Sequence, residues 1–286
     1  GLADPRTIAA CQLTGSVLTT TNHDRDNFGL TYVYPVVSRR AGGVSIGINL
    51  NPNNACNWAC VYCQVPNLTR GGAPDIDLSQ LESELQHMLQ QVSHGDFMAQ
   101  NVPPEARRLN DVAFSGNGEP TSAACFAEAV DVVERQLRQF GLLGKIKVVL
   151  ITNGSLMARP QVQQALRRLA AINGEVWFKL DRGSTADVLQ VNQVNLTMDN
   201  VLRHLAIAAE LCPTWVQTCM FAMDGQLPGD AVDDAYLQCL RQVLAEGVKL
   251  QGVLLYGLAR PSLQPAAGRL SAAPEAWMMA IKKKIK

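Results

Sequence analysis

The segment that decides the fold is Asn54-Ala55-Cys56-Asn57-Trp58-Ala59-Cys60-Val61-Tyr62-Cys63-Gln64, whose three cysteines have the spacing C-x3-C-x2-C. It follows the apolar run 44–50, which predicts a short buried strand. Three thiols this close in sequence can converge on one metal centre, and thiolates favour zinc or iron–sulfur clusters. Structural zinc would want a fourth Cys or His, and the sequence has no second C-x2-C and no H-x3-H. The alternative to a metal centre is three buried, inert cysteines in a loop.

Outward from this loop, β-branched apolar runs alternate with segments of helical periodicity. Strands are predicted over 112–114, 146–152, 176–180, 215–220 and 248–256, and helices over 78–92, 123–140, 160–172, 198–211, 231–246 and 274–286. The first helix has apolar residues at helical spacing, and Asp77 or Ser79 could cap it. Counting the terminal helix, these are six β-then-α units, which predict right-handed crossovers and a parallel sheet buried on both faces. The first forty residues predict an irregular extension.

Composition limits the classes of protein that this chain can belong to. Its 286 residues are 47% hydrophobic and 17% charged, which excludes disorder and coiled coil as the dominant state. Lys plus Arg and Asp plus Glu both number 25, so a strongly basic nucleic-acid binder is disfavoured and DNA is not expected as a partner. Residues 1–11 lack an apolar signal core, and no stretch has the ~18 apolar residues of a membrane span. We therefore expect a cytoplasmic protein without a membrane partner.

The cysteine loop, in its place after a strand, resembles the hallmark of the radical S-adenosylmethionine (radical SAM) superfamily. Tyr62, between the second and third cysteines, also follows the pattern of that superfamily. The resemblance covers about residues 33–260 and implies a partial (β/α)6 barrel of the α/β class. On this basis we expect an extension over 1–40, the barrel over 41–261, and a closing loop and helix over 262–286. The resemblance further implies a [4Fe-4S] cluster held by Cys56, Cys60 and Cys63, with S-adenosylmethionine bound at the open iron.

The run Ser115-Gly116-Asn117-Gly118-Glu119-Pro120 ends the second predicted strand and resembles the superfamily's glycine–glycine–glutamate motif. In that motif the backbone and the glutamate hold the amino group of S-adenosylmethionine. The residue types suit this role, because glycine lets a backbone approach a ligand and a carboxylate attracts an ammonium. Asn117 interrupts the glycine pair, which departs from the pattern. The alternative is an ordinary Gly-Asn-Gly turn at the end of a strand.

Polar residues also end the third and fourth predicted strands, where the active face of a barrel lies. Asn153 and Ser155 follow the third strand, and the resemblance implies contacts to the ribose or carboxylate of the cofactor. At the fourth strand, Lys179 or Arg182 could pair with the cofactor carboxylate, and Asp181 could contact the substrate or ribose. The alternatives are an Asn-Gly turn and a solvated charge cluster.

Three segments are similar to radical SAM proteins grouped with the tRNA wyosine-forming enzymes, namely 34–40, 45–50 with the cysteine loop, and 257–261. Wyosine-forming enzymes condense pyruvate with a guanosine of tRNA and hold a second cluster with extra N-terminal cysteines. Only Cys11 precedes Cys56 here, so this chain departs from them. Arg39, Arg40 and the tail lysines could bind phosphate, but a solvated face is the simpler interpretation.

The resemblance implies reductive cleavage of S-adenosylmethionine to a 5′-deoxyadenosyl radical that abstracts hydrogen from a substrate, with flavodoxin or ferredoxin as electron donor. The neutral net charge favours a small-molecule or peptide substrate over tRNA. The alternatives are a wyosine-like tRNA-modifying enzyme and a zinc-binding structural protein. No catalytic side chain and no role for a histidine is predicted. The remaining cysteines, Cys125, Cys212, Cys219 and Cys239, are expected to be packing residues, although Cys212 and Cys219 could flank a site or a second cluster.

Overall fold

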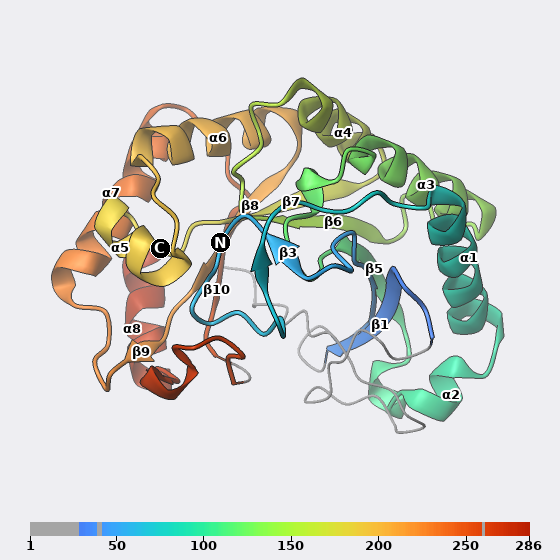
Figure 1. The fold of residues 1–286 in the computed structure, drawn as a ribbon, viewed down its shortest axis with the longest axis horizontal. Coiled ribbons are helices and arrows are strands. Elements are labelled where there is room, and N and C mark those ends of the chain that lie inside the picture. Colours follow the sequence, from blue (N-terminus) through green and yellow to red (C-terminus); the bar gives the residue numbers. More distant parts are fainter. Residues whose placement is uncertain (1–28, 39–41, 259–260) are drawn as a thin grey trace.

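The structure, a computed structural model, describes residues 29–38, 42–258 and 261–286, and its centre is a seven-stranded sheet (Figure 1). The strands, in sheet order, are β1 (Val33–Ser38), β2 (Gly43–Ile48), β5 (Leu109–Phe114), β6 (Lys147–Thr152), β7 (Gly174–Lys179), β8 (Thr214–Cys219) and β10 (Gly252–Tyr256). The six strands from β2 to β10 are parallel, and β1 is antiparallel to β2. Among the described residues β1 and β10 do not pair with each other, so the sheet is an open, partial barrel. The predicted fold class is confirmed.

Helices follow the parallel strands and form an outer arc around the sheet (Figure 1). They are α1 (Leu78–His94), α3 (Phe126–Gln139), α4 (Pro160–Ala171), α6 (Met198–Leu211), α7 (Asp230–Ala245) and α8 (Glu275–Ile285), with the shorter α2 (Phe97–Asn101) and α5 (Thr185–Asn192). Two small strand pairs complete the chain, β3 (Ala55–Cys56) with β4 (Thr69–Arg70), and β9 (Ala222–Met223) with β11 (Leu270–Ser271). No helix of the described part is long and apolar enough to cross a membrane.

The two faces of the sheet bury different side chains, because successive residues of a strand point to opposite faces. Phe114 and Leu150 belong to the large core between the sheet and the helices. Ala113, Val149 and Leu254, which alternate with such residues along the strands, belong to a separate cluster. That cluster includes Trp177, which lines the cavity described below. The inner face of the sheet is therefore the floor of the site.

Most predicted helices and strands are confirmed, and the cap of α1 shows why. The Asp77 side chain accepts a hydrogen bond from the Gln80 backbone N–H at 3.0 Å, so α1 begins at Leu78. Its predicted apolar stripe, including Leu81, Leu85 and Leu89, is fully buried. The last predicted strand was wrong at its start, because β10 begins at Gly252 rather than Val248.

The prediction that the first forty residues are irregular is wrong for 33–38. The β-branched residues Val33, Val36 and Val37 form β1, and Pro35 is tolerated because β1 is an edge strand. The helix α5, which lies between β7 and α6 and is capped by Ser184, was also not predicted. The expectations for Cys11, Arg39, Arg40 and 259–260 fall outside the described residues, and the proposed boundaries at 40 and 261 stay predictions.

Candidate active site

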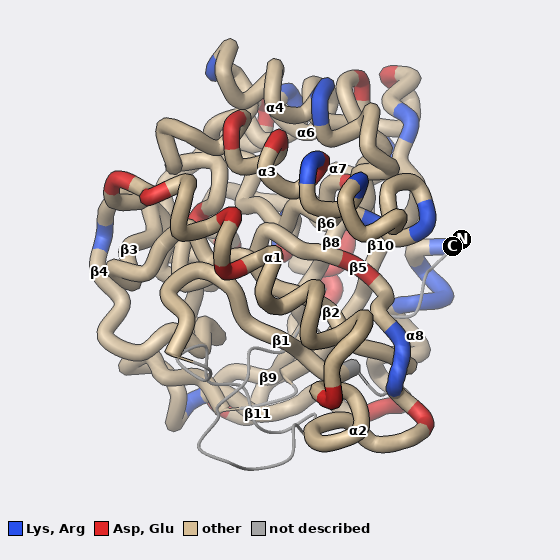
Figure 2. The backbone as a smooth tube through the Cα atoms, turned by 90° about the vertical axis from the view of Figure 1, so that its right-hand side faces the viewer, with Lys and Arg blue, Asp and Glu red and all other residues tan. Residues whose placement is uncertain are grey.

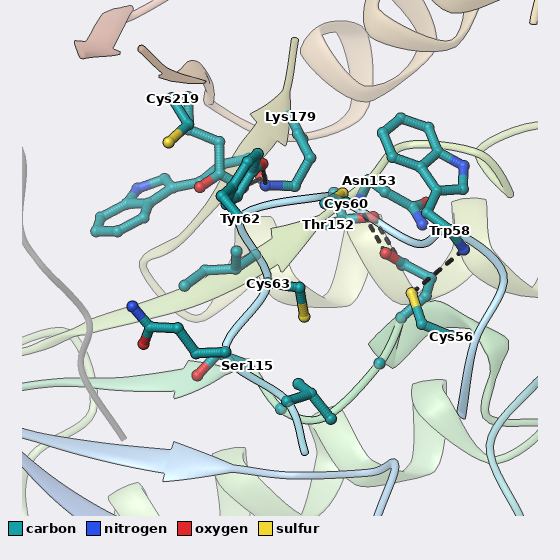
Figure 3. Close-up of a pocket in the computed structure, with 18 of the residues that line it drawn as sticks. Cys56, Trp58, Cys60, Tyr62, Cys63, Ser115, Thr152, Asn153, Lys179 and Cys219 are labelled. Carbon is teal, nitrogen blue, oxygen red and sulfur yellow. Dashed lines mark hydrogen bonds between the residues drawn. The ribbon is translucent and has the colours of Figure 1, made fainter. Parts of the chain in front are cut away.

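A cavity of about 280 Å³ lies at the carboxyl ends of the parallel strands, where the cysteine loop after β2 covers the inner face of the sheet. Each of the five strands that follow β2 in the order of the large sheet contributes a residue to the cavity wall. These residues are Ser115 directly after β5, Asn153 directly after β6, and Lys179, Cys219 and Tyr256 at the ends of β7, β8 and β10. Parallel strands end at one edge of a sheet, so residues far apart in sequence meet there. Figure 3 shows several of these side chains around the pocket.

Cys56, Cys60 and Cys63 all line this cavity (Figure 3). Burial raises the pKa of the Cys56 thiol to about 11 and that of the Cys60 thiol to about 12. Both thiols are therefore protonated at neutral pH in the absence of a metal. Metal binding would have to displace these protons, as it does wherever thiolates are ligands.

The donor set of the loop fits an iron–sulfur cluster. The Trp58 backbone N–H lies 3.5 Å from Cys56 Sγ, and the side-chain amide of Asn192 lies 3.2 Å from Cys60 Sγ. Hydrogen bonds to sulfur are among the interactions that set the properties of such clusters. In the described part of the chain no three His, Cys, Asp or Glu side chains converge on a position for a single ion. A [4Fe-4S] cluster takes each thiolate on a different iron, so it does not require that convergence.

The loop Gly116-Asn117-Gly118 lies directly against the cysteine loop. A Cβ atom on Gly118 would be 1.9 Å from the Ala55 backbone oxygen, and one on Gly116 would be 2.3 Å from Asn49 Oδ1. The Asn117 backbone N–H donates to the same Asn49 oxygen at 3.0 Å. Glycine is thus required here for close packing of two loops. All three loop residues also line the cavity, and their contact with a cofactor stays a prediction.

Glu119 is 2% exposed and joins the ends of β5 and β6. Its carboxylate accepts hydrogen bonds from the Thr152 hydroxyl and the Asn153 backbone N–H, both at 2.7 Å, and from Thr121. Burial raises the pKa of this carboxyl group, and the hydrogen bonds only partly oppose it. Glu119 lines the cavity, but both of its oxygens already have partners within the protein.

Asn153 connects this strand end to the cysteine loop. Its side-chain amide donates to Asn57 Oδ1 at 2.7 Å, and Asn57 donates in turn to Ser155 Oγ at 2.8 Å. The Ser155 hydroxyl donates back to Asn153 Oδ1 at 2.7 Å. Asn153 lines the cavity. Ser155 does not line it, and is connected to the cavity wall through its hydrogen bonds with Asn153 and Asn57.

Lys179 is the cation that the structure brings to the cavity from the two predicted candidates. Its Nζ lies 2.6 Å from the Tyr62 hydroxyl and 3.5 Å from the Tyr256 hydroxyl. Tyr62 donates in turn to Asp181 Oδ2 at 2.6 Å. Burial opposes the charge of Lys179, but the neighbouring Tyr256 and Asp181 act against burial, and the pKa of the ammonium is raised. Arg182 instead donates to the backbone oxygens of Asp181 and Cys219.

Several site residues were not predicted. Tyr256 and Trp58 line the cavity, and Asn49, Asn57 and Asn192 hold its loops. Cys219, expected to be a packing residue or to flank a site, is both buried and part of the cavity wall. Cys212 is buried away from it with its thiol against the Gly174 oxygen. The contacts that were not predicted join loops to strand ends. Only Tyr256 could have been predicted to line the cavity, because it is the last residue of a predicted strand.

No protein-family model matches the chain. A UPF0026 protein of Helicobacter pylori strain J99 is 26% identical over 186 residues, which cover 62% of this chain and 54% of that protein. A UPF0026 protein of Methanocaldococcus jannaschii is 24% identical over 155 residues, 52% of this chain and 43% of that protein. The chain therefore spans about half the length of these curated relatives.

Two solved structures share the fold. A radical SAM methyltransferase from Sphaerobacter thermophilus superposes with a TM-score of 0.57 at 16% identity, over 88% of this chain and 66% of that one. TYW1 with a lysine–pyruvate adduct bound superposes with a TM-score of 0.54 at 13% identity, over 84% of this chain and 72% of that one. The open sheet of six parallel strands is thus the fold that this chain shares with a radical SAM methyltransferase and with TYW1.

Proposed function

We propose that the chain is a radical SAM enzyme that holds a [4Fe-4S] cluster through Cys56, Cys60 and Cys63 and binds S-adenosylmethionine in the adjoining cavity. A cluster held there would supply one-electron reduction of S-adenosylmethionine, the chemistry that yields methionine and a 5′-deoxyadenosyl radical able to take a hydrogen atom from a substrate. The observation that carries the proposal is that three thiols of one loop line a single cavity that also contains the half-buried cation of Lys179.

The chain's own residues bind and orient the cofactor. Lys179 is the group on the wall suited to the cofactor carboxylate, because its charge is retained among Tyr62, Tyr256 and Asp181. Asn153 offers an amide at the neighbouring strand end. We assign Glu119 to the cofactor amino group, as the resemblance implies, and its hydrogen bonds also hold Thr152 and Asn153 in place.

The inner end of the cavity is apolar, which suits a site for radical chemistry. Ile151, Trp177 and Leu254 line it from three different strands. The indole N–H of Trp177 is bonded to Glu175 at 3.1 Å, so it does not need a partner in the cavity. Such a wall excludes water and leaves few protons to react with an intermediate.

A small molecule or peptide is our proposed substrate, and a flavodoxin or ferredoxin our proposed electron donor. The zero net charge supports a substrate other than a polyanion. A reducing cytoplasm is consistent with the seven described cysteines, all of which are free thiols.

A wyosine-like reaction on tRNA is the second candidate, because the fold is shared with TYW1. The exposed Lys282, Lys283 and Lys284 lie in the last turn of α8, so this end of the helix carries the positive charge that such a partner would need (Figure 2). A salt-dependent tRNA-binding assay tests it, with these three lysines replaced by glutamine as the matched variant. Absence of binding at low salt, or binding unchanged in that variant, would remove this support.

Anaerobic reconstitution tests the main proposal. The protein should take up four irons and four sulfides for each chain, and with dithionite and S-adenosylmethionine it should form 5′-deoxyadenosine. The Cys60→Ala variant should lose both properties. Cys239→Ala is the control, since Cys239 is buried with its thiol against the Gly183 oxygen, away from the cavity. Stoichiometric zinc without iron uptake would instead support a zinc-binding protein.

A further inference from the structure

The short helix α5 ends directly against the cysteine loop. The Asn192 backbone oxygen accepts from the Ala59 N–H at 3.1 Å, and the Val191 oxygen accepts from the Val61 N–H at 2.9 Å. Ala59 and Val61 flank Cys60, so two bonds from the end of α5 hold the backbone on both sides of this thiol. The end of α5 is therefore a structural support of the loop.

The Asn192 side chain reaches the thiol itself. It is 1% exposed, and its amide nitrogen lies 3.2 Å from Cys60 Sγ and 2.9 Å from Asp181 Oδ2. An amide nitrogen has two N–H groups, so it can donate to both atoms at once. Asp181 Oδ2 also accepts from Tyr62, which contacts Lys179. A continuous set of hydrogen bonds thus runs from the Cys60 sulfur to the cation of the cavity.

We propose that Asn192 is a positioning residue for Cys60 whose hydrogen bond to the sulfur raises the reduction potential of the bound cluster. This inference rests on the proposed function, because it presupposes the cluster. Reduction adds negative charge to the cluster and its sulfur ligands. An N–H directed at a ligating sulfur stabilises that charge, most effectively where water is excluded. The contact with Asp181 helps to keep the amide oriented toward the sulfur.

Gln264 provides a matched comparison on another part of the loop. Its amide nitrogen donates to the backbone oxygens of Cys63 at 3.1 Å and Val65 at 2.9 Å. It supports the loop through a side-chain amide, as Asn192 does, but this amide donates to backbone oxygens rather than to a thiol. Replacing each amide with leucine therefore separates support of the loop from a hydrogen bond to sulfur.

The experiment is a redox titration of the reconstituted cluster, followed by electron paramagnetic resonance in the absence of S-adenosylmethionine. In Asn192→Leu the equilibrium constant for reduction should fall about tenfold, a shift of ~59 mV to more negative potential for one electron. Gln264→Leu should stay within about threefold of the parent protein. Asn192→Ala should shift in the same direction as Asn192→Leu and provides the measurement if the leucine does not fold.

Two results would overturn the inference. Unchanged potentials in the Asn192 variants would show that the hydrogen bond does not tune the cluster. An equal shift in Gln264→Leu would show that loosening of the loop is the cause. Either result leaves the proposed function intact, because a cluster has then formed. Failure of the parent protein to form a cluster would refute the proposed function itself, and this inference with it.

Discussion

Gly154, between the cavity residue Asn153 and its partner Ser155, is the position where a single methyl group should matter most. Its φ of +73° lies in the left-handed region, and a Cβ atom there would be 2.1 Å from Cε2 of Phe178. The Phe178 ring is itself buried in the core between sheet and helices, so it has no free space to move into. Gly154→Ala therefore combines backbone strain with overpacking.

The two terms can be estimated and measured separately. The left-handed conformation costs about 1 to 2 kcal/mol and the overpacking about 1 to 3 kcal/mol, so we expect a loss of about 2 to 5 kcal/mol of unfolding free energy. Gly141 has a φ of +67° with nothing within 4 Å of its would-be Cβ. Gly141→Ala should therefore cost only the backbone term.

Urea unfolding of the two variants gives the comparison, with the midpoint and slope of each transition recorded. The double variant Gly154→Ala with Phe178→Ala should recover the steric term, which a double-mutant cycle reports as a coupling between the two positions. Equal losses for Gly154→Ala and Gly141→Ala, or no coupling to Phe178, would refute the steric argument.

Three further predictions concern the cavity wall. Gly118→Ala should greatly reduce the iron content after reconstitution, since its Cβ would overlap the Ala55 backbone oxygen and displace the cysteine loop; iron content equal to the parent's would contradict this. Lys179→Met should weaken S-adenosylmethionine binding at least about tenfold in equilibrium dialysis, because it removes the cation of the cavity wall while keeping an unbranched side chain; unchanged affinity would place the carboxylate elsewhere. Burial raises the pKa of Glu119 above its usual 4.5, so the stability it contributes should be fully present below pH 4.5 and lost as pH rises through the raised value. Unfolding of the parent and of Glu119→Gln from pH 4 to 8 should show this slope in the parent only, and parallel profiles would refute it.

The elements that the sequence predicts well are those with local signals at both ends. For α6 the predicted range 198–211 matches the structure, because the Thr197 side chain accepts from the Asn200 N–H at its start and Pro213 follows its end. In contrast, α5 has eight residues and buries mainly Val188, Val191 and Asn192, so its apolar pattern is too short to recognise.

The same distinction holds for the site. The spacing of the cysteines is local, and the positions of Asn153 and Lys179 after their strands follow from the alternation of elements. The contact of Tyr62 with Asp181 joins residues 119 positions apart, and that of Asn192 with Cys60 joins residues 132 apart. These pairings depend on how the strand ends and α5 meet the loop, which no local pattern in the sequence specifies.

The support of the cysteine loop by residues 262–264 has a consequence for the order of events during synthesis. The Ser262 hydroxyl donates to the Val61 oxygen at 2.6 Å across 201 positions of the chain. At 5 to 20 residues per second a ribosome needs roughly 10 to 40 s to make that stretch. For that interval the three thiols have left the ribosome without the segment that completes their surroundings. Loading of metal is thus expected after translation, with the nascent thiols open to oxidants and competing ions until then.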